Sequence, residues 1–337
     1  MTAHFPASID LPNVLETVRA VFPEHEIPSS VEYVPDQDWV IHVQSTWKPI
    51  VVGGGSSNDE DKKNKQHQRF VLTFPWHTAD DVEEAIQRVN EENNNNSPDT
   101  TNDLHQQYTE LKLQGGVAFG TGEHPTTQLC LEWLTKVVPN VLTTQAAVSN
   151  DNEDDSTVWL MDYGAGSGIL GMAACKLAQN QQKSSRLQAI GVDIDVDACR
   201  IANDNAHQNT VNMRNYLPPL SSAADDVSKA LLLKARQHAL AQLEKDPSST
   251  ENALLFMPDE LEGKQYDICV ANILAGPLIA LAPTLASLVV PGGYLGLSGI
   301  LAPLGEDVVQ AYQAAGFQNV QVEKEQGGWV LVTGVKQ

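Results

Sequence analysis

A glycine-rich segment in the middle of the chain has the residue types that hold a nucleotide-like cofactor. It reads Asp162-Tyr-Gly164-Ala-Gly166-Ser-Gly168 and stands between an apolar run and a helix-forming run. Glycines let the backbone turn sharply and approach a ligand closely. The spacing G-x-G-x-G does not fit the dinucleotide pattern, whose third small residue would fall on Ile169. The segment therefore predicts a cofactor site and disfavours a nicotinamide oxidoreductase.

An acidic residue stands at the end of the next apolar run, which closes with Gly191-Val-Asp193-Ile-Asp195. A carboxylate at the carboxyl end of a parallel strand can accept hydrogen bonds from both hydroxyls of a ribose. Asp193 is the better candidate for this role, because Asp195 is equally well placed to cap the helix that starts at Val196. The glycine loop and the acid together, in this order, favour a bound nucleoside.

These residues belong to an alternation of short apolar runs and helix-forming runs, which predicts a mostly parallel sheet with helices on both faces. The predicted strands are Val158–Tyr163, Ala189–Asp193, Tyr266–Ile273, Gly293–Ser298 and Trp329–Val335. The predicted helices are Pro125–Val138, Gly168–Gln179, Val196–Gln208, Pro277–Val289 and Leu304–Ala315. A short glycine turn separates Val320–Glu325 from the last strand and predicts a hairpin at the end of the sheet.

Residues 1–110 lack this alternation and predict a small amino-terminal α+β recognition module, ahead of a second domain over 111–337. Polar stretches at Gly53–Gln68, Asn90–Asn102 and Thr144–Thr157 predict solvated loops or insertions, since they hold too little apolar surface to fold. The stretch 221–251 differs, because Val227–Leu240 is rich in helix formers. It predicts a helical insertion on the surface.

The composition excludes several classes of protein. In 337 residues, no apolar run is long enough to cross a bilayer, so no membrane association is expected. The net charge of −22 disfavours direct binding of nucleic acid, which depends on Lys and Arg at phosphates. The four cysteines form no C-x-x-C pair, so no metal site is expected. Arg19 is the only basic residue among the first 25, which predicts a cytoplasmic location, or a mitochondrion or plastid if a leader is missing.

The motifs resemble the ribosomal protein L11 methyltransferase family, whose members are class I S-adenosylmethionine-dependent methyltransferases. A family segment of the type G-x-A-F-G-T-G-x-H-x-T-T matches Gly116–Thr127. The family's cofactor loop matches Asp162–Leu170, except that Ala165 stands where the family usually has cysteine. Further matching segments are Gly191–Asp195, Asp204–Asn209, Ala271–Leu278 and Gly292–Leu301. The polar stretches interrupt the match in the amino-terminal part.

The resemblance implies a seven-stranded Rossmann-like sheet with an antiparallel last strand. It also implies transfer of a methyl group from S-adenosyl-L-methionine to lysine or α-amino groups of a protein, with ribosomal protein L11 as the first candidate substrate. The lysine methyltransferases of the electron transfer flavoprotein beta subunit are similar in sequence, so that subunit is the alternative substrate. A non-catalytic binding module on the same fold is the alternative from another class.

The resemblance further implies which residues form the site. Asn272 and Thr121 are the candidate catalytic residues, and the Asn272 side-chain oxygen would accept a hydrogen bond from the incoming amine. Asp162 would pair with the ammonium group of the cofactor, and Asp193 with its ribose. The implied cofactor-binding residues are Phe119, Gly120, Thr121, Gly122, Asp162, Gly164, Gly166, Gly168, Asp193 and Asn272.

Some residues have two interpretations that the sequence leaves open. His124 could act as a base, but a role at the start of a helix is favoured because Pro125 follows it. Trp329 is interpreted as a core aromatic. Trp47 could pack in the core or line the path of the target amine, and Glu123 is as well explained by solvation as by function.

Overall fold

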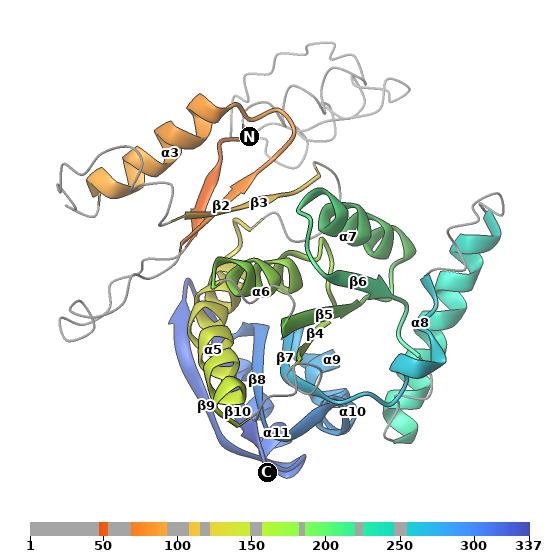
Figure 1. The fold of residues 1–337 in the computed structure, drawn as a ribbon. Helices are drawn as coiled ribbons and strands as arrows, with labels where there is room; N and C mark the ends of the chain where they lie inside the picture. Colours follow the sequence, from red (N-terminus) through yellow and green to blue (C-terminus); the bar gives the residue numbers. More distant parts are fainter. Residues whose placement is uncertain are drawn as a thin grey trace, which may run out of the picture. The chain divides into compact units, whose positions relative to one another are not determined.

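The structure is a computed structural model that describes residues 47–52, 69–92, 108–114, 122–148, 157–181, 186–219, 225–245 and 255–337. The chain divides into two compact units, Met1–Trp47 and Lys48–Gln337. The elements described below belong to the second unit (Figure 1). The predictions for Phe119, Gly120 and Thr121 fall outside the described residues, as do those for a leader. The predicted domain division at residue 110 stays a prediction.

A seven-stranded sheet forms the centre of this unit, with the strand order β6-β5-β4-β7-β8-β10-β9. Its strands are β4 (Val158–Tyr163), β5 (Leu187–Val192), β6 (Met213–Tyr216), β7 (Tyr266–Asn272), β8 (Val289–Leu301), β9 (Phe317–Gln326) and β10 (Trp329–Lys336). The pairs from β6 to β8 are parallel, and β10 runs antiparallel to both of its neighbours. The predicted fold class, including the antiparallel last strand, is confirmed.

The order of the strands determines where a ligand can bind. The chain moves outward from β4 through β5 to β6 and then returns to form β7 on the other side of β4. Tyr163 at the end of β4 pairs with Ala271 near the end of β7, so the loops that follow these two strands diverge from adjacent points. Parallel sheets bind ligands in the crevice at such a reversal of strand order.

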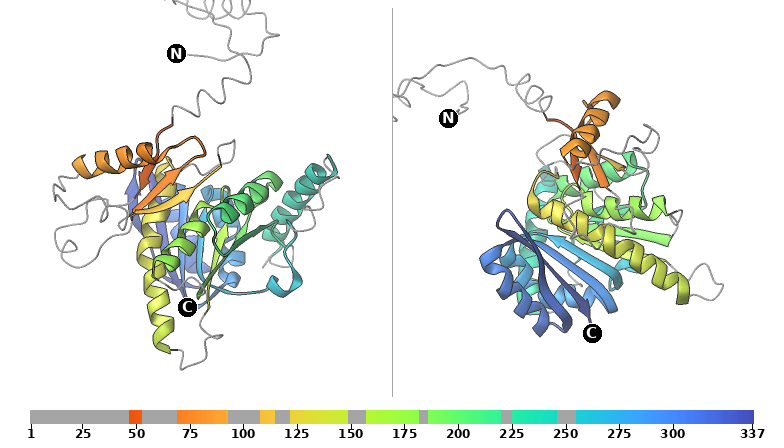
Figure 2. Two further views of the ribbon diagram at one scale, coloured as in Figure 1. Left: turned by 45° about the horizontal axis from the view of Figure 1, so that its top comes forward. Right: turned by 90° about the vertical axis from the view of Figure 1, so that its left-hand side faces the viewer.

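Helices cover both faces of the sheet. The helices α5 (Pro125–Val148), α6 (Ile169–Asn180) and α7 (Val196–Gln208) lie on one face, and α9 (Ala275–Ala280), α10 (Ala282–Leu288) and α11 (Gly305–Ala314) lie on the other (Figure 2). The second group packs a large apolar core against β7 and β8, to which Leu278, Leu285 and Tyr312 contribute. Both faces of β4, β7 and β8 are therefore buried, as their continuous apolar runs require. Within the described residues, no helix combines the length and the hydropathy needed to cross a bilayer.

Several predicted elements differ from the structure, and the largest difference in a strand is β8, which begins at Val289 and not at Gly293. Helix α5 continues past Pro139 to Val148, whereas the prediction ended it at Val138. The predicted helix Pro277–Val289 is two helices that meet at Leu281. The strand β6 was not predicted, because its four residues are too short and too polar to stand out, and its pairing with β5 supplies what its sequence lacks.

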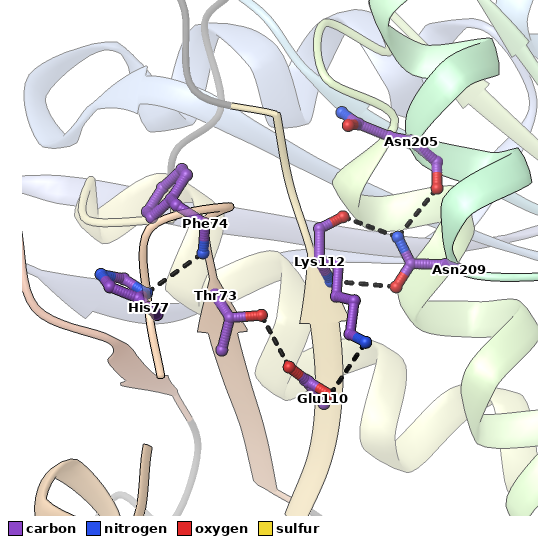
Figure 3. Close-up of polar contacts among 7 residues, drawn as sticks. All are labelled: Thr73, Phe74, His77, Glu110, Lys112, Asn205 and Asn209. Carbon is purple, nitrogen blue, oxygen red and sulfur yellow. Dashed lines mark hydrogen bonds and ion pairs between the residues drawn. The ribbon is translucent and has the colours of Figure 1, made fainter. Parts of the chain in front are cut away.

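A small three-stranded sheet precedes the large one in sequence. Its strands are β1 (Ile50–Val52), β2 (Arg69–Thr73) and β3 (Tyr108–Lys112), in that order, accompanied by helix α3 (Ala79–Glu92). Two buried asparagines, Asn205 in α7 and Asn209 directly after it, connect β3 and the residues that follow it to the rest of the unit; Figure 3 shows the contact of Asn209 with Lys112. Asn209 accepts a hydrogen bond from the Lys112 backbone N–H and donates one to the Lys112 carbonyl. Asn205 accepts from Gln114 N and donates to Ser167 O, which ties β3 to the glycine loop.

Candidate active site

A cavity of about 860 Å³ lies at the carboxyl ends of β4, β5 and β7. Its lining comes from segments that are far apart in the sequence: the glycine loop, the ends of β5 and β7, the start of α5, and Trp329 at the start of β10. The cavity therefore occupies the position that the reversal of strand order predicts for a ligand.

The glycine loop forms one wall of this cavity with backbone atoms that no side chain covers. Gly164, Gly166 and Gly168 have φ angles of 78°, 55° and 78°, a region that side chains disfavour. A Cβ atom on Gly164 would overlap the Ile273 side chain. Gly164 and Gly166 line the cavity, whereas Gly168 packs against Ala202 of α7 and begins the turn into α6.

Asp193 faces the cavity directly after β5, and the backbone holds its carboxylate in place. Its Oδ2 atom accepts a hydrogen bond from Gly166 N at 2.8 Å, and its Oδ1 atom accepts one from Asp195 N at 3.0 Å. Burial raises the pKa of Asp193, while these hydrogen bonds oppose the shift. Asp195 caps α7 by accepting from Asp197 N and Ala198 N, so its predicted capping role is confirmed.

Asp162 lies beneath the loop rather than on the cavity surface. Its side chain is fully buried, and Oδ2 accepts a hydrogen bond from Gly171 N at 2.9 Å. Among the described residues, Oδ1 has no hydrogen-bond partner. Burial raises the pKa of Asp162 to about 7, with a further contribution from the charge of Asp193. The site thus contains one carboxylate at the cavity surface and a second one buried below the glycine loop.

Asn272 ends β7 and lines the cavity together with Ile273 and Leu274. Its Nδ2 atom donates a hydrogen bond to Thr127 Oγ1, at 3.3 Å. Thr127 is buried in the first turn of α5, so the contact orients the amide and leaves Oδ1 as the acceptor. Thr127 was not predicted as a site residue, although it is the last residue of the family segment Gly116–Thr127.

Two aromatic rings form the wall near the start of α5. His124 and Trp329 both line the cavity, and their rings meet edge to face with centroids 4.8 Å apart. His124 Nδ1 is engaged by Thr126 Oγ1 at 2.8 Å, directly before α5, which fits the favoured role at the start of the helix. Trp329 is only partly buried, so its interpretation as a core residue was wrong. No local pattern indicates this contact, because His124 and Trp329 are far apart in the sequence.

Gly122, the only cofactor-site prediction of its segment within the described residues, packs against the small sheet. It has a φ angle of 90°, and a Cβ atom there would overlap the Leu72 side chain of β2. Gly122 is buried, but it does not line the cavity. Gly122 therefore lies against β2, two residues before His124.

Comparison with known proteins identifies the family to which this architecture belongs. The family model "Ribosomal protein L11 methyltransferase (PrmA)" matches residues 94–337. A ribosomal protein L11 methyltransferase from Pseudomonas syringae pv. tomato is 32% identical over 328 residues, covering 97% of this chain and 77% of that protein. Its counterpart from Pseudomonas putida is 31% identical over 338 residues, covering 99% and 80%. The chain belongs to the ribosomal protein L11 methyltransferase family.

A crystal structure of a ribosomal protein L11 methylase from Lactobacillus delbrueckii subsp. bulgaricus also matches, with a TM-score of 0.46 and 20% identity over 81% of this chain and 97% of that one. Membership in the L11 methyltransferase family confirms the expected enzyme class and cofactor. The chain is a methyltransferase, and S-adenosylmethionine is its methyl donor.

The cavity of this L11 methyltransferase family member suits that cofactor. Bare backbone at Gly164 and Gly166 admits close approach, and the Asp193 carboxylate offers an acceptor for hydroxyl groups. Beyond Asp193, the lining is apolar at Ile194 and Pro218, as a nucleoside base requires. A cavity of this size with few, well-placed polar groups is typical of a cofactor site.

The remaining wall comes from helix α8 (Asp226–Lys245), which lies beside the β6 edge of the sheet (Figure 1). Leu231, Leu232 and Ala235 of this helix line the cavity. The predicted helix exists, but its interpretation as a surface insertion was wrong for one face. A run of helix formers shows that a helix forms and does not show which element it covers.

Proposed function

We propose that this enzyme moves a methyl group from S-adenosylmethionine to lysine or α-amino groups of ribosomal protein L11. The observation that carries the proposal is the orientation of Asn272 by Thr127 at the end of β7, with Asn272 on the cavity surface. The names of the relatives support L11 as the substrate.

When bound, the cofactor supplies an electrophilic methyl group on a sulfonium, whose C–S bond breaks as the N–C bond to the amine forms. A lysine amine has an unperturbed pKa of about 10.4, so it must lose a proton before it can attack. In this proposal the Asn272 Oδ1 atom accepts a hydrogen bond from the neutral amine and aims its lone pair. Asp193 is the only carboxylate among the described residues that line the cavity. With Asp193 assigned to the ribose, water takes the proton.

The other cofactor contacts follow the same assignment. Asp193 holds the ribose hydroxyls, and Gly164 and Gly166 allow close approach of the backbone. Asp162, whose Oδ1 atom has no hydrogen-bond partner among the described residues, is assigned to stabilise the ammonium group electrostatically from below the loop. Phe119, Gly120 and Thr121 are assigned to the methionine half, and Thr121 stays a candidate catalytic residue together with Asn272. Gly122 is left out of this assignment, because it packs against Leu72 and does not line the cavity.

A label-transfer assay tests this function. Purified ribosomal protein L11 and the electron transfer flavoprotein beta subunit are offered in parallel to the enzyme with labelled S-adenosylmethionine, and mass spectrometry locates the methyl groups. We expect label on amines of L11. Label on the flavoprotein subunit alone would replace L11 as the substrate. Label on neither, with cofactor binding intact, would favour the non-catalytic alternative.

The role of Asn272 has its own test. Asn272→Ala is expected to lower turnover at least about 100-fold while changing the affinity for S-adenosylhomocysteine less than about threefold, since the amide acts on the amine. Thr127→Val, which removes the hydroxyl and keeps the shape, should produce a smaller loss of the same kind. Equal losses of turnover and affinity would move Asn272 into the cofactor pocket.

A further inference from the structure

Helix α8 carries a single buried stripe along its whole length. Its buried members are spaced as one face of a helix and are Ser228, Leu232, Ala239 and Leu243, at 0%, 2%, 1% and 9% exposure. The half-buried Ala235 falls in the same stripe. Leu233, by contrast, is 39% exposed and does not line the cavity. A stripe of this kind must be covered by something along its full length.

Protein covers the two ends of the stripe. At the carboxyl end, Ala239 and Leu243 pack in an apolar cluster with Val196 and Cys199 of α7. At the amino end, the Ser228 hydroxyl donates a hydrogen bond to the Ala280 carbonyl, the last residue of α9, at 3.1 Å. These contacts therefore hold α8 on both sides of the cavity, and the middle of the helix spans the cavity.

The cavity lies against the middle of the stripe. Leu232 and Ala235 line it, and so do Ile194 after β5, Pro218 after β6 and Leu281 between α9 and α10. All five are apolar, and the Ile194 side chain is 55% exposed. The slot that they form has no polar side chain of its own and opens next to Asp193.

We propose that α8 is part of the cofactor site and that Leu232 and Ala235 are the wall against which the adenine base packs. This inference rests on the proposed position of the cofactor, with Asp193 at the ribose. The base is the flat and largely apolar part of the cofactor, and it lies one bond from the ribose. The polar methionine half needs charged partners, which this slot does not offer. The exposed side chain of Ile194 becomes covered when the base enters.

The test compares two adjacent leucines of α8, of which Leu232 is buried and Leu233 is exposed. Leu232→Ala removes a side chain from the slot, whereas Leu233→Ala removes the same atoms from an exposed position outside the cavity. Calorimetry with S-adenosylhomocysteine and with adenosine should show both ligands weakened about tenfold or more by Leu232→Ala, and less than about twofold by Leu233→Ala. If Leu232→Ala weakens the binding of S-adenosylhomocysteine but not that of adenosine, α8 lies at the methionine half of the cofactor and the assignment is overturned.

A second pair of variants excludes a general loss of folding. Ala235→Phe fills the slot without removing any native contact, and Ala230→Phe adds the same ring at an exposed position of α8 that does not line the cavity. We expect Ala235→Phe to weaken adenosine binding about tenfold or more, since overpacking leaves no room for the base, with an unchanged far-ultraviolet circular dichroism spectrum. Equal affinities for the two variants would overturn the proposal.

Asp193→Ala separates this inference from the assignment on which it rests. If Asp193→Ala weakens adenosine binding but Leu232→Ala and Ala235→Phe do not, the cofactor position stands and the role of α8 is refuted. If Asp193→Ala leaves adenosine binding unchanged, the cofactor position itself is wrong.

Discussion

The two walls of the cavity are built in different ways. The wall formed by Gly164, Gly166 and Asp193 is made of backbone with positive φ angles and of a carboxylate held by two backbone N–H groups. The opposite wall, Leu232 and Ala235 of α8, is made of apolar side chains on a regular helix. The first depends on geometry that few residues can adopt, and the second on contact area that many residues can supply. Single substitutions should therefore cost more on the loop side than on the helix side.

The largest effect is expected from Gly164→Ala. Alanine at a φ of 78° is strained, and its Cβ would overlap Ile273. Together these effects should lower the free energy of unfolding by roughly 2–5 kcal/mol and remove measurable binding of S-adenosylhomocysteine. Urea unfolding and calorimetry provide the two measurements.

Gly328 offers a matched control for this substitution. Its φ is 80°, and a Cβ atom there would meet nothing within 4 Å. Gly328→Ala should cost only the backbone strain, about 1–2 kcal/mol, and leave cofactor binding intact. Equal costs at Gly164 and Gly328 would show that the loop wall is no more closely packed than a surface turn.

The second effect concerns the carboxylate below the loop. Because the pKa of Asp162 is raised to about 7 from 3.8, the folded state prefers its protonated form. Stability of the wild type should therefore fall as the pH rises from about 4 to 7 and stay lower above 7, by up to about 4 kcal/mol. Asp162→Asn keeps an acceptor for Gly171 N and cannot ionise, so its advantage over the wild type should grow with pH and then level off.

Urea unfolding of the cofactor-free enzyme from pH 4.5 to 8.5 measures this difference. Parallel pH profiles for the wild type and Asp162→Asn would refute a buried Asp162 carboxyl group with a raised pKa. The Leu232→Ala variant sharpens the comparison of the walls, because it removes no titrating group and its stability should follow the wild-type pH profile.

The third effect is the loss of the ribose carboxylate. Asp193→Ala is expected to weaken the binding of S-adenosylhomocysteine by about 1.5–3 kcal/mol, the scale of charge-assisted hydrogen bonds. Calorimetry measures it, and Asp195→Ala serves as the control, since that residue caps α7 and should affect stability rather than affinity. Unchanged affinity in Asp193→Ala would mean that this wall binds the cofactor through the backbone of the glycine loop alone.

The sequence predicted the elements whose signals are local. The strand β4 and the helix α7 have the predicted bounds, because each is a run of one periodicity between turn residues. The strand β6 and the continuation of α5 past Pro139 were missed, because pairing with β5 and packing of α5 against the sheet override weak local preferences. The break at Leu281 does have a local signal, because Pro283 stands in the first turn of α10, where its missing N–H is tolerated.

The site divides in the same way. The glycine loop, Asp193 and Asn272 were predicted because each follows a strand within a motif. Trp329 was misread, and the wall of α8 was not predicted, since both meet the cavity through contacts between distant parts of the chain. A buried stripe can be found in a sequence, but the ligand or element that covers it depends on the fold.

The smallest effect is expected from the hydrogen bond that holds the amino end of α8. Ser228→Ala removes the hydrogen bond to the Ala280 carbonyl, which should lower the free energy of unfolding by about 1 kcal/mol. On the inferred role of α8, the loosened helix should also release S-adenosylhomocysteine faster, by about twofold to fivefold in stopped-flow fluorescence, because a wall anchored at one end opens more often. Ser228→Thr retains the hydroxyl and should restore the slow release. If Ser228→Ala lowers stability without changing the release rate, the helix side of the cavity is as rigid as the loop side, and the contrast between the two walls fails.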